Sequence, residues 1–190
     1  MKRAFLFMLV LTLCVFLFTA CGKLGSKEGQ STPAGEEPLK ITDISEDGIL
    51  GGSVRLGMPK AEMFAAMEGK GLTLLAPSEE DGTITEDGGL ILPSNSEIAY
   101  YSYDDYTFGV NSEGAITDIF VVNDAEFATA AGLKLGGTLE DMTWIYGDQY
   151  VVRRDTFGNP YYVYQLRENY LMIGIAEEVV AIRYSIFDKW

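Results

Sequence analysis

The chain has 190 residues, 47% of them apolar, and its 28 acidic against 14 basic residues give a net charge of −14. That length suffices for one domain or two small ones with a packed core, and the negative charge argues against nucleic-acid binding, which relies on Lys and Arg to neutralise phosphates. The sequence contains no histidine, which removes the commonest general base and the usual zinc ligand.

The first 20 residues predict a signal peptide. Two basic residues precede an apolar run over 5–18, which is shorter than the about 20 residues that a membrane span needs. The Thr-Ala-Cys-Gly sequence at 19–22 resembles the end of a bacterial lipoprotein signal. That resemblance implies lipidation of Cys21 and an extracytoplasmic chain, held at the bacterial cell membrane by its acyl chains. An ordinary signal peptide or an uncleaved anchor is the alternative.

A flexible tether is predicted after the signal. Residues 21–38 are rich in Gly, Ser, Pro and charge, so they bury too little surface to offset the entropy of ordering. The other cysteine, Cys14, lies inside the signal. A chain processed before Cys21 would therefore have no internal disulfide and no cysteine nucleophile.

An internal repeat is the main feature of the remaining chain. Segment 56–63, Leu-Gly-Met-Pro-Lys-Ala-Glu-Met, matches 135–142, Leu-Gly-Gly-Thr-Leu-Glu-Asp-Met, and a glycine follows each segment at Gly69 and Gly147. Aromatic segments follow in the same order, which predicts two tandem repeats, 39–123 and 124–190. Chance similarity of short apolar strings is the alternative.

Each repeat is expected to contain helix and then strand. Apolar spacing and cap residues predict helices over 59–69, 124–131 and 138–147. Aromatic and β-branched runs predict strands at 98–103, 106–111, 115–122, 150–153, 161–166, 170–176 and 179–187. The expected fold class is α+β, with two tandem repeats that each pack short helices on an antiparallel β-sheet.

The two Leu-Gly segments and the aromatic strands after them resemble the β-lactamase-inhibitor-protein-like fold. The single unit resembles the small lipoproteins of the outer-membrane assembly machinery. The resemblance covers most of 50–187 and implies a concave sheet surface that contacts a protein partner. It carries over no inhibitory residue, and a fold analogy is weak evidence for function.

The candidate partner-binding residues lie in an aromatic strand and in an acidic insertion. Tyr101 and Tyr103 share one face of the strand, beside Asp104 and Asp105, and tyrosine is enriched at protein interfaces. The same reasoning applies to the second aromatic strand, at 161–164. The opposite interpretation is that these rings lie in the core. The acidic insertion comprises Glu79, Glu80 and Asp81.

Catalysis and metal binding receive less support. The acidic stretch 79–89 lacks the alternating ligands of an EF-hand, and we expect no metal and no cofactor. We expect a non-enzymatic, membrane-anchored envelope lipoprotein that binds a protein partner through its sheet face and loops. A cell-wall polymer as ligand, a carboxylate-dependent carbohydrate-active hydrolase and a purely structural cell-wall protein remain alternatives.

Overall fold

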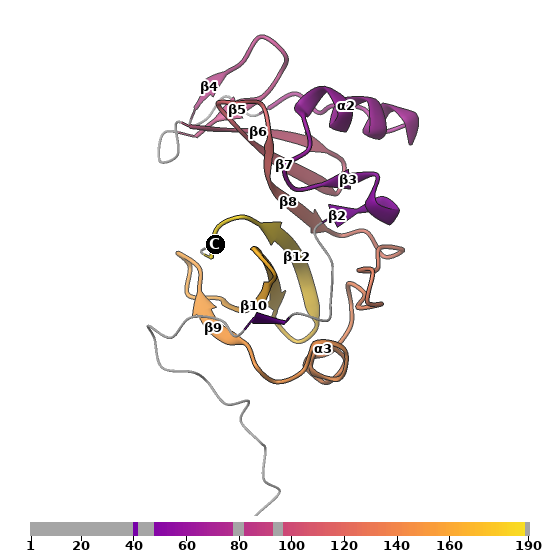
Figure 1. The fold of residues 1–190 in the computed structure, drawn as a ribbon, viewed down its shortest axis with the longest axis vertical. Helices are drawn as coiled ribbons and strands as arrows, with labels where there is room; N and C mark the ends of the chain where they lie inside the picture. The colour runs from indigo at the N-terminus through magenta and orange to yellow at the C-terminus, as the bar shows by residue number, and fades with distance from the viewer. Residues whose placement is uncertain (1–39, 42–47, 78–81, 93–96, 189–190) are drawn as a thin grey trace, which may run out of the picture. The chain divides into compact units, whose positions relative to one another are not determined.

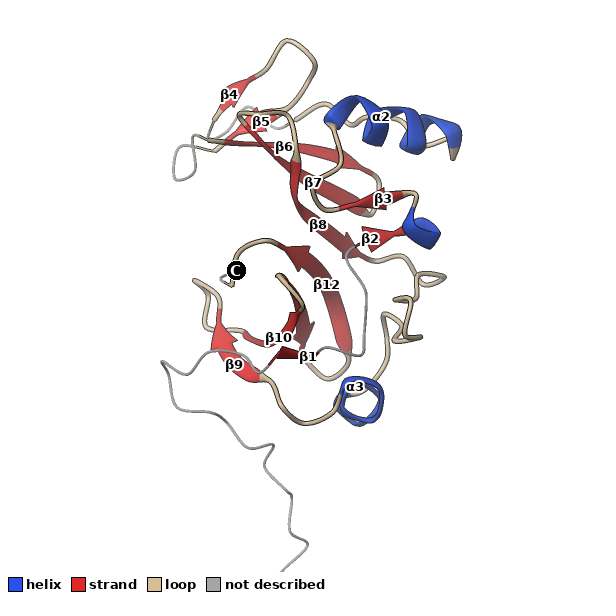
Figure 2. Ribbon diagram, in the orientation of Figure 1, coloured by secondary structure: helices blue, strands red, loops and turns tan. Residues whose placement is uncertain are grey.

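Strands dominate the fold (Figure 1, Figure 2). The computed structural model describes residues 40–41, 48–77, 82–92 and 97–188, which belong to one unit, Thr32–Trp190. The elements are β1 (Lys40–Ile41), β2 (Gly48–Ile49), a 3-10 turn η1 (Leu50–Gly52), β3 (Val54–Arg55), α2 (Lys60–Gly69), β4 (Thr83–Ile84), β5 (Leu90–Ile91), β6 (Ile98–Tyr103), β7 (Tyr106–Asn111), β8 (Ile116–Val122), α3 (Leu139–Tyr146), β9 (Val151–Arg154), β10 (Pro160–Leu166), β11 (Asn169–Ile175) and β12 (Val179–Ser185).

One sheet contains ten of these strands. Its order is β1-β10-β11-β12-β8-β7-β6-β5-β4, and β9 also pairs with β10. Neighbouring strands run antiparallel except β1, which is parallel to β10. The predicted α+β class, with two helix-on-sheet repeats, is therefore wrong, because the described fold is mainly β.

The two predicted repeats do not form separate sheets, because the last strand of the first repeat pairs with the last strand of the second. Residues 118–122 of β8 pair with 181–185 of β12. An unpaired edge strand exposes a row of backbone N–H and C=O groups, and pairing of two such edges satisfies both. The two helices have ten and eight residues, so they cover only part of the resulting sheet.

Most of the individual strands and helices predicted from the sequence are confirmed. The seven predicted strands correspond to β6–β12, and α2 and α3 form where helices were expected. At the start of α3, the Thr138 Oγ1 accepts the Asp141 N–H at 3.1 Å, while the Asp141 carboxylate accepts the Thr138 N–H at 2.8 Å. The predicted helix at 124–131 is wrong, because the Asp124 carboxylate accepts the N–H groups of Glu126 and Phe127 and thereby forms a turn.

The two matching Leu-Gly segments make the same backbone contact. Gly57 and Gly136 have φ angles of 76° and 80°, a conformation that glycine adopts without steric cost. The Gly57 N–H donates to the Ile116 carbonyl at 2.8 Å, and the Gly136 N–H donates to the Val179 carbonyl at 2.8 Å. Each turn is thus fixed to the first residue of a hairpin strand, β8 or β12.

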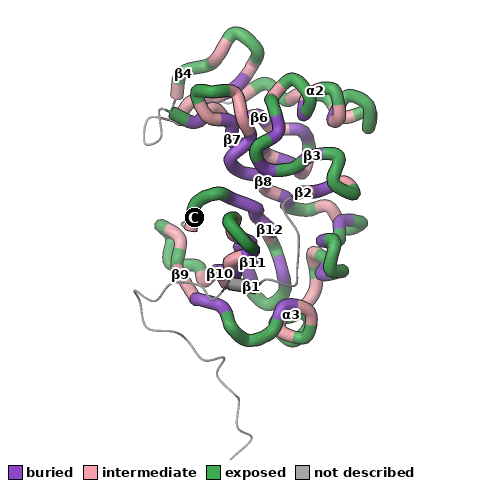
Figure 3. The backbone as a smooth tube through the Cα atoms, in the orientation of Figure 1, coloured by how far each residue is buried: buried purple, intermediate pink, exposed green. Residues whose placement is uncertain are grey.

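An aromatic and aliphatic row crosses the sheet on the face that α2 covers. Its register partners, in sheet order, are Tyr101, Phe108, Ile119, Tyr184, Leu171 and Tyr164. All six side chains are buried in one core, which Figure 3 shows as purple segments of the central strands. Because alternate residues of a strand point to opposite faces, Tyr100 and its register partners lie on the other face.

Candidate functional site

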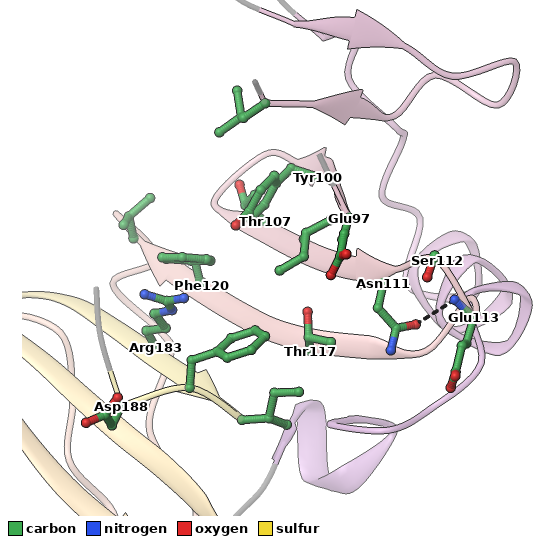
Figure 4. Close-up of a pocket in the computed structure, with 15 residues that line it drawn as sticks. Glu97, Tyr100, Thr107, Asn111, Ser112, Glu113, Thr117, Phe120, Arg183 and Asp188 are labelled. Atoms are coloured by element: carbon green, nitrogen blue, oxygen red, sulfur yellow. Dashed lines mark hydrogen bonds between the residues drawn. The ribbon is translucent and has the colours of Figure 1, made fainter. Parts of the chain in front are cut away.

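A groove of about 1180 Å³ lies on the sheet face opposite α2 (Figure 4). Its floor comes from β6, β7, β8 and β12, and residues 186–188 form one wall. Two neighbouring rows of register partners lie on this face: Tyr100, Gly109, Asp118 and Ser185 in one, and Thr107, Phe120 and Arg183 in the other. The groove therefore depends on the pairing of β8 with β12.

A buried ion pair joins β8 and β12 beneath the groove. The Asp118 carboxylate accepts hydrogen bonds from Arg183 Nε at 2.9 Å and from Arg183 Nη2. It also accepts Ser185 Oγ–H at 2.7 Å and Thr117 Oγ1–H at 3.0 Å. A Cβ at Gly109 would lie 2.9 Å from Asp118 Oδ2, so the carboxylate occupies space that only glycine leaves open.

An aromatic cluster rests on this ion pair. The Arg183 guanidinium lies 4.6 Å from the centre of the Phe120 ring, a favourable cation–π distance. Tyr100 meets Phe120 edge to face, with ring centres 6.5 Å apart. These contacts hold the aromatic side chains of the groove in fixed positions.

The wall after β12 is apolar and tied to the sheet. Ile186 and Phe187 are each 41% exposed. The Ile186 N–H donates to a β8 carbonyl, that of Thr117, at 3.0 Å. Asp188 forms an ion pair with Arg153 of β9 at 2.9 Å. The wall therefore presents apolar side chains from an anchored backbone.

The end of the groove at the turn between β7 and β8 is acidic. Glu97 and Glu113 are exposed and line the groove. Within the described ranges, neither carboxylate takes part in a hydrogen bond or an ion pair. The Asn111 carboxamide oxygen accepts the N–H groups of Glu113 at 3.1 Å and Ala115 at 2.9 Å, which fixes the turn that carries Glu113.

The expectation that Tyr101 and Tyr103 present an exposed face is wrong. They are only 2% and 1% exposed, because Phe64 of α2 packs on them with ring centres 5.2 Å and 6.2 Å away. The structure thus places the predicted anchor rings in the core. The neighbouring Tyr100, on the other face, lines the groove instead.

The Tyr101 hydroxyl belongs to a clasp between α2 and the β4–β5 hairpin. Lys60 Nζ donates to Asp87 Oδ2 and lies 3.3 Å from the Tyr101 hydroxyl, which donates to Asp87 Oδ1 at 3.1 Å. The hydrogen bond from Lys60 lowers the pKa of Asp87 to about 2, and the same bond raises the pKa of Lys60. This cluster is better suited to hold the hairpin on α2 than to bind a ligand.

The two aspartates after Tyr103 form the turn between β6 and β7. Asp104 is exposed with a φ of 42°, a left-handed conformation that Asp tolerates in two-residue hairpin turns. The Asp105 carbonyl accepts the Val122 N–H at 2.9 Å. Both residues therefore have a structural role, and neither lines the groove.

The tyrosines of the second aromatic strand are mainly internal. Tyr161 and Tyr164 are buried, whereas Tyr162 is half-buried. The Tyr164 hydroxyl donates to the Gly147 carbonyl at 2.7 Å, which links β10 to the end of α3. Burial raises the pKa of Tyr164, as expected for a core phenol.

Several predicted site residues lie outside the described residues. These are Cys21 and the acidic insertion residues Glu79, Glu80 and Asp81. Among the residues that the structure does describe, no group of three or more Cys, Asp or Glu side chains could hold a metal ion. No helix in the described ranges is long and apolar enough to cross a membrane.

Comparisons with known proteins identify no relative. No protein-family model matches the chain, and neither the curated proteins nor the solved structures gave a match. The resemblance noted from the sequence therefore gains no support from them, and the geometry of the groove carries the functional argument.

The sequence analysis gave no role to the groove residues Phe120 and Arg183 or to Asp118 beneath them. A signal was present, because a charged residue inside an apolar strand is rarely buried without a partner. Asp118 and Arg183 each interrupt such a strand. Their opposite charges could have suggested that β8 and β12 are neighbours.

Proposed function

We propose that this chain is a non-enzymatic, membrane-anchored envelope lipoprotein that binds a protein partner in the sheet groove. The observation that carries the proposal is the exposed apolar lining of the groove, formed by Val122, Ile186 and Phe187 beside the Phe120 cluster. Aromatic and aliphatic side chains fixed in a concave surface are typical of the centre of protein interfaces.

The size of the groove also favours a macromolecular ligand. Its volume of about 1180 Å³ exceeds the range of about 300–1,000 Å³ that is usual for small-molecule sites. The overall charge of −14 disfavours an acidic partner and steers a basic or mixed one toward the chain.

The hydrogen bonds of the buried Asp118 carboxylate support a binding role rather than a catalytic one. Asp118 accepts four hydrogen bonds from Arg183, Ser185 and Thr117. A carboxylate that is saturated in this way is poorly placed to exchange a proton with a substrate. Its chemistry fits a structural role in the groove floor.

Site-specific photo-crosslinking in living cells tests partner binding. A photoreactive phenylalanine analogue at Val122 or Phe187 is expected to form the same single protein adduct. Val180 is a matched control, because it is 47% exposed and lies outside the groove. Adducts of equal yield from Val180, or none from the groove positions, would contradict the proposal. Adducts with glycan alone would instead indicate a cell-wall polymer as ligand.

A separate experiment tests the membrane anchor. Cys21→Ser is expected to abolish incorporation of radiolabelled fatty acid and to release the chain into the soluble fraction, because in this proposal the Cys21 thiol carries the lipid. Cys14→Ser is the matched control and should leave labelling unchanged. Continued labelling of the Cys21→Ser chain would exclude this site of lipidation.

A further inference from the structure

We infer that the groove recognises a polypeptide segment with a Lys or Arg side chain at one end and a large apolar side chain at the other. This inference rests on the proposed function and names the chemistry of the partner. It follows from the separation of the two unpaired carboxylates from the aromatic cluster along the groove (Figure 4), with Glu97 and Glu113 toward one end and Phe120, packed on the paired Arg183, toward the other.

The unpaired charge of the described groove lining is negative. Arg183 is neutralised by Asp118, and Asp188 by Arg153. Glu97 and Glu113 remain, with neither carboxylate in an ion pair. A cationic side chain of the partner is therefore attracted to the acidic end.

The acidic end presents its charge from a fixed backbone. Glu113 lies in the β7–β8 turn, where Asn111 accepts two N–H groups, and Glu97 immediately precedes β6. The Glu97 position is held near this turn because Ile98, the next residue, pairs with Asn111. A backbone that is already ordered at both positions loses less conformational freedom when the side chains bind a cation.

The other end favours an apolar side chain. Val122 is 36% exposed there and lines the groove with Phe120, whereas Ile186 and Phe187 line the side wall beside Thr117. The guanidinium of Arg183 lies against Phe120 at 4.6 Å, so this aromatic ring already has a cationic neighbour and is a poor site for a second cation. An apolar side chain would instead gain buried area against Val122 and Phe120.

A polypeptide is the simplest ligand that carries both a cationic and a large apolar side chain. Nucleic acids and acidic lipids carry negative charge and are repelled by the glutamates. A neutral glycan could stack on the aromatic rings, but its binding would not depend on the charges of Glu97 and Glu113. Charge-neutral substitutions therefore distinguish a peptide from a glycan.

Selection from a phage-displayed library of random peptides on the immobilised full-length chain in detergent tests this inference. Peptides that bind the groove are expected to be enriched in Lys or Arg together with an aromatic or large aliphatic residue. E97Q/E113Q should weaken these peptides by about 2- to 30-fold, the range for loss of two exposed ion pairs. The matched control E62Q/E68Q makes the same charge change on exposed positions of α2 and should leave their affinity unchanged.

The outcomes separate this inference from the proposed function. Peptides that bind V122D/F187D as well as the unaltered chain do not use the groove, and that result would overturn both proposals. Groove-dependent peptides without a basic residue, or with equal affinity for E97Q/E113Q, would overturn only the cationic specificity. Equal weakening by E62Q/E68Q would show that net charge, rather than the groove end, attracts the peptide, and would also overturn it.

Discussion

Removal of the Arg183 guanidinium is expected to destabilise the fold by about 3–5 kcal/mol. Arg183→Met retains an unbranched stem near Phe120 but deletes two of the four hydrogen bonds that Asp118 accepts. A hydrogen bond to a charged group contributes about 1.5–3 kcal/mol. The variant would leave a fully buried carboxylate with only the Ser185 and Thr117 hydroxyl donors.

Urea unfolding followed by far-ultraviolet circular dichroism measures this loss. The urea concentration at the midpoint should fall, while the slope of the free energy of unfolding against urea concentration stays the same, because the surface exposed on unfolding is unchanged. The double variant Asp118→Leu/Arg183→Met should recover much of the stability, since it removes the uncompensated charge. Arg154→Met is the control: this arginine is exposed and donates to the Gly158 carbonyl in a turn, so a change below about 1 kcal/mol is expected.

A free energy of unfolding of Arg183→Met within about 1 kcal/mol of that of the unaltered chain would refute this reasoning, because a buried carboxylate without its charged partner costs more than that. A double variant that is no more stable than Arg183→Met would refute it as well. If the double variant is only as stable as the single one, the packing of Arg183 on Phe120, rather than its charge, holds β8 to β12.

Two further predictions concern the clasp and the aromatic strand. The pKa of Asp87 is lowered from 3.8 to about 2 in the folded chain by the hydrogen bond from Lys60, so its stabilisation is present above about pH 4 and is lost as the pH falls toward 2. Because Asp87 is partly exposed, D87N should lower the free energy of unfolding by less than about 1 kcal/mol at pH 6 and by nothing near pH 2, as measured by urea unfolding. A loss that does not change with pH would contradict this coupling between ionisation and stability. Tyr103→Ala should cost about 3–5 kcal/mol, because the ring is buried under α2, whereas Tyr100→Ala should cost far less stability but reduce photo-crosslinking from Val122. Equal losses of stability would refute this assignment of the two faces.

Local sequence was enough to predict most of the elements. Alternating aromatic and β-branched residues predicted the strands, and the short polar segments 111–114 and 176–178 predicted the hairpin turns that the structure has there. The start of α3 was also predictable, since the Thr138 cap and Asp141 are three residues apart. These features depend on contacts between residues close in the chain.

The candidate site was only partly predictable. Alternation showed that Tyr101 and Tyr103 share a face opposite Tyr100, but both faces of that strand carry aromatic rings. The sequence therefore did not reveal which face the helix covers. Packing of Phe64 on the Tyr101 ring decided it, and the binding surface moved to the other side of the sheet.

The sequence by itself determined the strands, the turns, the acidic charge and the repeated Leu-Gly segments. Only the tertiary structure decided that the two halves form one sheet, because the pairing of β8 with β12 joins residues such as Asp118 and Arg183 that are 65 positions apart. Local propensity carries no information about partners at that separation. The same long-range pairing creates the groove floor, so the proposed binding surface is a product of the assembled sheet rather than of either repeated segment.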